Sequence, residues 1–301
     1  MKFFAATSGL GRIVQWAFPW EFSPTVIVCC VVAIVLYARG IRREIAAGAV
    51  RSRGRRASFY LGIAFIYVPL QTRFDYLAQH MFWIHRLQHL LLHHIAPILI
   101  AWAAPWSGLA AGLPTRWRAR VSRTVLGGPI RAIYSVLQQP LIAGALFTGL
   151  IYFWLWPAIH FRAMLSADEY EWMNWSMVLD GLLFWWLILD PRSSEEGALM
   201  SFGGRIALVL LSMAPQLLLG AYLSLHRRIL YDVYSVCGRL WAIDPMTDQQ
   251  IGGLITWIPA CMMSVGVTLV MWRRWMVNDH RVQTLRKEAS ARMDPIAGSL
   301  P

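Results

Sequence analysis

Long apolar segments separated by short arginine-rich stretches constrain the fold of this chain more than any other feature. A helix that crosses a bilayer needs about 20 mostly apolar residues. Seven stretches meet this requirement: residues 22–39, 57–76, 80–104, 137–160, 170–189, 203–226 and 249–275. The mean hydropathy of +0.47 and the 57% share of hydrophobic residues exceed those of soluble domains. The sequence therefore predicts an all-α, polytopic membrane helix bundle with seven transmembrane helices.

The distribution of basic residues predicts the orientation of these helices. Seven arginines follow the first segment and five follow the third, and the end of the seventh segment together with the tail holds six basic residues. The alternate loops carry fewer arginines or balance them with acidic residues. Lys and Arg concentrate on the cytoplasmic side, so we expect the N-terminus outside and the C-terminus in the cytoplasm. Residues 1–21 would be a periplasmic tail, 22–276 the membrane domain and 277–301 a disordered cytoplasmic tail. The net charge of +12 then reflects topology and not nucleic-acid binding.

Five of the eight histidines lie in one segment, "HMFWIHRLQHLLLHHIAP" (80–97). Residues four apart share a helix face, so His85, His89 and His93 would form one stripe, with His80 and His94 pointing roughly the opposite way. Polar groups in hydrocarbon are costly, so five imidazoles favour a site over interhelical packing. A neighbouring pair can hold one soft metal ion, most simply Cu(I), if other helices supply further ligands. The candidates for these ligands are His160, Met263 and Cys261.

Four further polar residues are expected around this metal site. Asp180 interrupts the fifth segment, and its carboxylate can either accept a ring N–H of a ligating histidine or form an ion pair with Arg86. The sequence leaves these two alternatives open. Asp248 can cap the last helix and Gln249 can face the site. The adjacent glycines at 252 and 253 permit close helix approach.

Three motifs resemble those of the multi-span CtaG-like cytochrome c oxidase assembly factors: "HRLQHLLLHHIAPILIAWAAP" (85–105), "GLLFWWLILDP" (181–191) and "DQQIGGLITWIP" (248–259). The likeness covers roughly residues 60–275. It implies a bacterial inner-membrane protein, not an enzyme, that acts in the maturation of haem–copper oxidases through copper supply. Its partners would be a cytochrome c oxidase subunit or the copper-delivery proteins, together with membrane lipids. By resemblance, His85 and His89 match the histidine helix, and Asp248 and Gln249 open the last motif.

Two histidines of the family pattern are absent from this sequence. The Trp-His-x-Pro element is replaced by "FWLWPAIHF", with His160 following closely, and Asn174 stands near the usual Glu-His pair. Two other classes of protein remain as alternatives. A membrane di-iron oxygenase needs histidine boxes on separate segments, and a b-type haem protein needs facing histidines at equal depth. A retinal protein is excluded because both lysines, Lys2 and Lys287, lie outside the segments.

Overall fold

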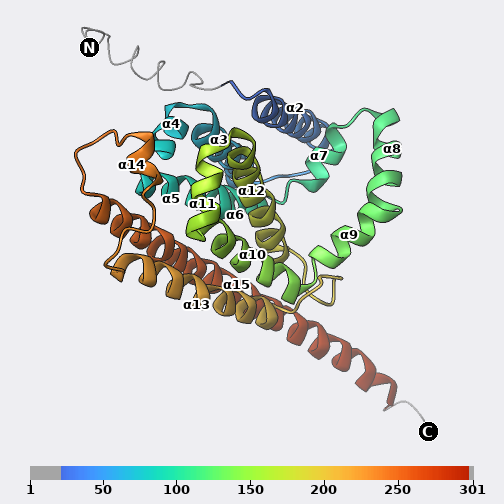
Figure 1. Cartoon of the computed structure of the whole chain (residues 1–301). Coiled ribbons are helices and arrows are strands. Elements are labelled where there is room, and N and C mark those ends of the chain that lie inside the picture. Colours follow the sequence, from blue (N-terminus) through green and yellow to red (C-terminus); the bar gives the residue numbers. More distant parts are fainter. Residues whose placement is uncertain (1–21, 298–301) are drawn as a thin grey trace.

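The computed structural model describes the backbone of residues 22–297 and the side chains of residues 22–121 and 127–288. All regular elements in this part of the chain are helices, and Figure 1 shows them packed as a bundle. Their bounds are α2 Pro24–Ala46, α3 Arg53–Gln71, α4 Arg73–His80, α5 Phe82–Leu90, the π-helix η1 Leu91–Ile95, α6 Ala96–Ala103, α7 Trp106–Gly112, α8 Thr115–Leu126, α9 Pro129–Leu137, α10 Pro140–Leu155, α11 Pro157–Leu165, α12 Ala167–Leu189, α13 Phe202–Leu225, α14 Val233–Cys237 and α15 Pro245–Ala297.

Four helices in the described residues are each long and apolar enough to cross a membrane: α2, α12, α13 and the Pro245–Glu288 part of α15. Two bent pairs raise the number of candidate spans to six. They are Phe82–Ala103 with α7, bent by 73°, and α9 with α10, bent by 75°. By length and composition the structure thus gives four to six candidate spans. The expected span at 57–76 is not among them, because α3 begins with three arginines and ends at Gln71.

Prolines divide a segment that the sequence predicted to be continuous. The expected span 137–160 contains a turn before Pro140 and a second break at Trp156. The residue before a proline avoids the helical region, and Gln139 and Trp156 both adopt extended conformations. Consequently α10 ends at Leu155, and His160 lies on the separate helix α11, outside the candidate spans.

The bundle has two ends of different chemistry. In Figure 1 the long helix α15 runs beside α13 and beneath α5, and both pairs are in contact. We call the end that contains α4, α11 and α14 the histidine end. The opposite end, where α3 and α13 begin and α6 and α12 finish, is the arginine end. Because α5, α12 and α15 all start at the histidine end, their first turns converge there.

The interior is apolar and aromatic, while several helices present apolar faces outward. Phe147 stacks on Phe184 with ring centroids 3.8 Å apart, and Tyr37 stacks on Phe59 at 3.9 Å. The outward faces of α2, α13 and α15 carry exposed apolar side chains, among them Val31, Val32, Val35, Leu211, Leu218, Met262, Val265 and Leu269. Helices with apolar residues on both faces are typical of segments that contact lipid.

The last helix is longer than expected. We predicted a disordered tail after residue 276, but α15 continues as a helix to Ala297. Figure 1 shows this C-terminal part projecting beyond the bundle. The expected tail at residues 1–21 lies outside the described residues.

Candidate functional site

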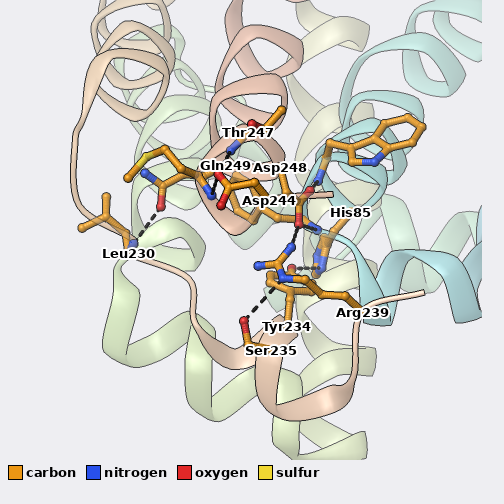
Figure 2. Close-up of polar contacts among 12 residues, drawn as sticks. His85, Leu230, Tyr234, Ser235, Arg239, Asp244, Thr247, Asp248 and Gln249 are labelled. Atoms are coloured by element: carbon orange, nitrogen blue, oxygen red, sulfur yellow. Dashed lines mark hydrogen bonds and ion pairs between the residues drawn. The ribbon is translucent and has the colours of Figure 1, made fainter. Parts of the chain in front are cut away.

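The histidine segment is broken at its start, and Asp248 holds the break in place. Met81 is extended, so α4 ends at His80 and α5 begins at Phe82. The carboxylate of Asp248 accepts hydrogen bonds from the backbone N–H groups of Phe82 at 3.1 Å and Trp83 at 2.9 Å. It also forms an ion pair with Arg239 (Figure 2). Asp248 therefore caps α5, a helix that is distant in sequence, and not its own helix α15 as we expected.

The rest of the last motif connects α15 to its neighbours. Gln249 accepts a hydrogen bond from the Leu230 N–H at 2.7 Å and donates one to the Arg228 carbonyl at 3.0 Å, which fixes the loop after α13 (Figure 2). A Cβ atom on Gly252 would lie 2.3 Å from Phe82, and one on Gly253 would lie 2.6 Å from the backbone N of Ser224. The glycine pair thus permits the close approach that the sequence predicted.

His85 and His89 belong to a chain of buried hydrogen bonds that joins four elements. The contacts are Arg86 Nη2 to His89 Nδ1 (3.2 Å), His89 Nε2 to His85 Nε2 (3.0 Å), His85 Nδ1 to Tyr234 OH (2.9 Å), Tyr234 OH to His160 Nε2 (2.9 Å) and His160 Nδ1 to the Trp154 carbonyl (3.0 Å). All five side chains are buried.

The direction of donation along these hydrogen bonds follows from the end at the Trp154 carbonyl. The Trp154 carbonyl can only accept, so His160 must donate through Nδ1. Burial lowers the pKa of His160 to about 3, so its ring is neutral and Nε2 is an acceptor. Tyr234 then donates its hydroxyl proton to His160. Burial also raises the pKa of Tyr234 well above 10, which keeps that proton in place. The phenol oxygen accepts from His85 Nδ1, which leaves a lone pair on His85 Nε2.

The other end of the chain gives the same direction. A guanidinium group can only donate, so Arg86 donates to His89 Nδ1. His89 must then carry its proton on Nε2, which donates to the lone pair of His85 Nε2. One tautomer of each histidine satisfies every contact. The Nε atom of Arg86 has no hydrogen-bond partner, although its side chain is buried.

His93 and His94 lie in the π-helix, which changes their position relative to the stripe predicted from a regular helix. His93 bonds through Nε2 to Asp180 at 3.1 Å and stacks on Phe147 at 4.2 Å. His94 was expected to point away from the other histidines. Instead it is buried beside His93, with the two ring centroids 5.0 Å apart. The wider π-turn adds a residue and so displaces the following side chains around the helix axis.

The "GLLFWW" motif is where α12 meets this π-turn. A Cβ atom on Gly181 would lie 2.5 Å from the His93 carbonyl, so only glycine fits at this contact. The indole N–H of Trp185 donates to the same carbonyl at 3.1 Å. Asp180 precedes this pair and bonds to the His93 ring, with no bond to Arg86. Of the two alternatives for Asp180, the structure contains the one in which the carboxylate bonds to a histidine ring.

A small cavity of about 20 Å³ lies beside the π-turn. It is lined by the polar side chains of Arg86, His89, His93, His94, Gln216 and Thr256 and by the apolar side chains of Leu90, Ile151, Met177 and Ile255. Arg86 Nε and the Nδ1 atoms of His93 and His94 have no hydrogen-bond partner. A buried water needs about 10–15 Å³ and two to four polar partners, so this cavity has room for one. The polar part of the lining thus extends from His89, in the His85–His89 pair, to His93.

Among the described residues, one pair of imidazoles has a spacing that fits a metal ion. Two imidazole nitrogens on one tetrahedral ion with bonds of about 2.0–2.1 Å lie roughly 3.3 Å apart. The Nε2 atoms of His85 and His89, at 3.0 Å, are close to that geometry. Among the described residues, no group of three or more His, Cys, Asp and Glu side chains could hold a metal ion. The donor set is therefore a pair of imidazoles, and the proton between them would have to leave.

The other predicted ligands do not join this pair. His160 is near, with its ring 5.2 Å from that of His85, but both of its nitrogens are hydrogen-bonded. Cys261 and Met263 are partly buried on α15 and lie about two and a half to three turns beyond the contact of Gly252 with α5. His93 faces Asp180 and Phe147.

The lining of a groove of about 410 Å³ at the histidine end includes three polar residues that were not among the predicted site residues. Tyr170, Asn174 and Asp75 line it, and the Tyr170 ring is 5.8 Å from that of His85. Tyr170 donates to Asp75 at 2.8 Å, and Asn174 interacts with His89. Gln88, which also bonds to Asp75 at 2.7 Å, was visible in the sequence as a polar residue inside the histidine segment. Tyr234 carries no such signal, because it lies between the predicted segments, on the short helix α14.

Together, the apolar helices and the buried imidazole chain define an all-helical protein of the membrane type with a polar site inside the bundle. The chain belongs to the Caa3_CtaG family, the cytochrome c oxidase caa3 assembly factors, whose pattern matches residues 35–278. The match includes the whole site, from α5 to α15.

Two curated proteins are also similar to this chain. They are the uncharacterized protein Mb0105 of Mycobacterium bovis and the uncharacterized protein MT0111 of Mycobacterium tuberculosis. Each is 22% identical over 269 residues, which is 87% of this chain. The chain spans 40% of the length of these relatives. No solved structure matches it.

Proposed function

We propose that this member of the oxidase assembly family handles copper, by binding one Cu(I) ion between His85 and His89 and passing it towards an oxidase subunit. The observation that supports this most is the pair of facing Nε2 atoms, 3.0 Å apart and buried beneath a groove at the histidine end. In this proposal the protein sits in the bacterial inner membrane with seven spans, the N-terminus and the histidine end outside, and residues 277–301 in the cytoplasm.

Ligand chemistry and charge together favour copper that is held briefly and then released. Imidazole nitrogens suit copper, and the remaining ligands of a tetrahedral Cu(I) ion would come from the docked partner. The positive charge of Arg86, 3.2 Å from His89, opposes a bound cation. Asp180 on His93 and the Met164 sulfur, 3.9 Å from the Tyr234 hydroxyl, lie nearby without contacting the pair. A weakly held ion is suited to transfer.

The groove of about 410 Å³ is the proposed approach to this pair. Its wall includes Tyr170 and Asn174, which also surround the two histidines. The oxidase subunit or a copper-delivery protein would dock over the groove. By contrast, the inner cavity of about 20 Å³ has room for a water but not for a haem.

Metal analysis of the purified protein tests the copper site. Wild type titrated with Cu(I) against a competing chelator should bind about one equivalent at equilibrium, while His85→Ala/His89→Ala should bind none. His80→Ala is the matched control, because its ring bonds within its own helix, to the Tyr76 carbonyl at 2.7 Å. A stoichiometric ion in the double variant would contradict the site, and equal loss in the control would indicate general damage.

A deletion strain tests the assembly role separately. We expect lower cytochrome c oxidase activity with the oxidase polypeptides still made, and partial recovery when copper is added. Complementation with the double variant should fail, and His80→Ala should restore activity. Normal oxidase activity and spectrum in the deletion strain would contradict the proposed role in assembly for this chain.

A further inference from the structure

A second large cavity, of about 370 Å³, lies at the arginine end of the bundle. Four arginines from two helices line it: Arg55 at the start of α3, and Arg273, Arg274 and Arg281 on α15. Among the described residues that line it, the only acidic side chain is Glu196. Its carboxylate accepts a hydrogen bond from the Ser193 N–H at 3.0 Å. The cavity therefore gathers four positive charges against one negative charge.

Three of these arginines have no partner among the described residues. Arg55, Arg273 and Arg281 form no hydrogen bond or ion pair with another described residue. Arg274 is held in place, since it donates to the Leu189 carbonyl at 3.1 Å and lies 4.8 Å from the centre of the Trp102 ring. Like charges repel at short range unless an anion lies between them. Guanidinium groups pair most strongly with phosphate and carboxylate.

The cavity has an apolar side as well. Trp102, Phe202, Val270 and Val277 also line it. Trp102 and the nearby Trp272 and Trp275 are exposed on the outer surface of the bundle. Tryptophans of this kind are typical of the level at which lipid headgroups meet the hydrocarbon. The cavity thus combines cationic and apolar side chains.

The position of the cavity along α15 agrees with the level of the lipid headgroups. Arg274 is 26 residues after Asp248 on α15, which places the two about 39 Å apart along the helix axis. A bilayer with its headgroup regions is about 40–45 Å thick. Since Asp248 lies at the histidine end, the arginine cavity falls in the headgroup region of the opposite leaflet if α15 crosses the membrane.

We propose that the arginine cavity binds a phosphate ester, namely the headgroup of an anionic phospholipid such as phosphatidylglycerol. The phosphodiester would lie among the guanidinium groups and the glycerol–acyl junction on Trp102 and Phe202. This site is separate from the copper site and does not depend on it. A soluble phosphate ester shares the same chemistry and is distinguished by the test.

Native mass spectrometry of the full-length protein in detergent tests the site, with phosphatidylglycerol and phosphatidylcholine of identical acyl chains as probes. Arg273→Gln/Arg281→Gln removes two charges from the cavity. Arg39→Gln/Arg42→Gln removes two exposed charges from α2, elsewhere on the protein. One cationic side chain near a headgroup contributes roughly fivefold in affinity, so the first variant should bind phosphatidylglycerol about 25-fold more weakly. The second should stay within about twofold of wild type.

Each outcome decides the proposal. Binding of phosphatidylcholine as tight as that of phosphatidylglycerol, or equal weakening in both variants, would overturn it, because either result would mean diffuse attraction and no specific site. Displacement of the lipid by millimolar glycerol 3-phosphate, with the same dependence on Arg273 and Arg281, would support the anion site and assign it to a soluble ester. No displacement would assign it to the lipid.

Discussion

Arg86 is the charged residue whose position in the bundle most needs a reason. It is 3% exposed, and its partners are the His89 ring and the face of Phe82, with no carboxylate. An ionised side chain among apolar helices is costly, and such residues usually have a functional role. In the hydrogen-bond chain Arg86 occupies His89 Nδ1, which keeps the His89 proton on Nε2, between the two histidines. Arg86 thereby opposes metal binding both by its charge and by its hydrogen bond.

Replacing Arg86 should therefore strengthen copper binding. We expect Arg86→Gln to bind Cu(I) about tenfold or more tightly, measured by competition with a Cu(I) chelator, because a positive charge is removed and His89 can move its proton to Nδ1. Arg162→Gln is the control, since that arginine is exposed and pairs with Glu169 on the surface. Weaker binding in Arg86→Gln would show that Arg86 positions the pair instead of opposing the ion.

Tyr234 should contribute more to stability than a tyrosine with one hydrogen bond. Its hydroxyl joins the rings of His85 and His160, so Tyr234→Phe leaves two buried nitrogens unpaired and should cost about 1–3 kcal/mol. Tyr231→Phe loses one bond, to the Leu155 carbonyl, and serves as the comparison. Thermal unfolding in detergent should give a lower Tm for Tyr234→Phe. Equal Tm values for the two variants would contradict the assigned hydrogen bonds of Tyr234.

At the scale of elements, the sequence predicted which segments are helical but not how those helices are interrupted. Apolar length is visible in composition, so α2, α12, α13 and the first part of α15 lie where we expected them. The break at Met81 depends on a carboxylate 167 residues further along the chain, and the π-turn depends on contacts with α12. Interactions of this kind leave no periodic signal. His85 and His89 were correctly placed together, whereas His94, which was expected to point away from the stripe, lines the same cavity as His89 and His93.

The role of Gly253 at the contact between α13 and α15 can be tested by substitution. Gly253→Leu should lower Tm strongly and abolish assembly activity, because a Cβ atom at this position already meets the Ser224 backbone at 2.6 Å. Gly266→Leu on the same helix is the matched control, since nothing lies within 4 Å of a Cβ atom there. It carries the same change in helix propensity and side-chain size. If the two variants lose stability equally, helix packing at Gly253 is not the cause.

At the scale of the whole molecule, the two polar sites lie at opposite ends of one helix. α15 contributes Asp248 to the histidine end and three arginines to the other end. The arginine-rich ends of α3 and α15 agree with the positive-inside rule only if the histidine end faces outward. The proposed copper site and the proposed lipid site would then face opposite sides of the membrane.

The orientation can be tested across a single helix. Ser194 and Arg227 are exposed in the loops that flank α13, a helix of 24 residues and thus about 36 Å long. In a background with the four cysteines replaced by serine, a membrane-impermeant maleimide should label Arg227→Cys in intact spheroplasts. Ser194→Cys should react only after the membrane is permeabilised. The opposite pattern would reverse the orientation and place the histidine end in the cytoplasm, whereas labelling of both sites in intact spheroplasts would show that α13 does not cross the membrane.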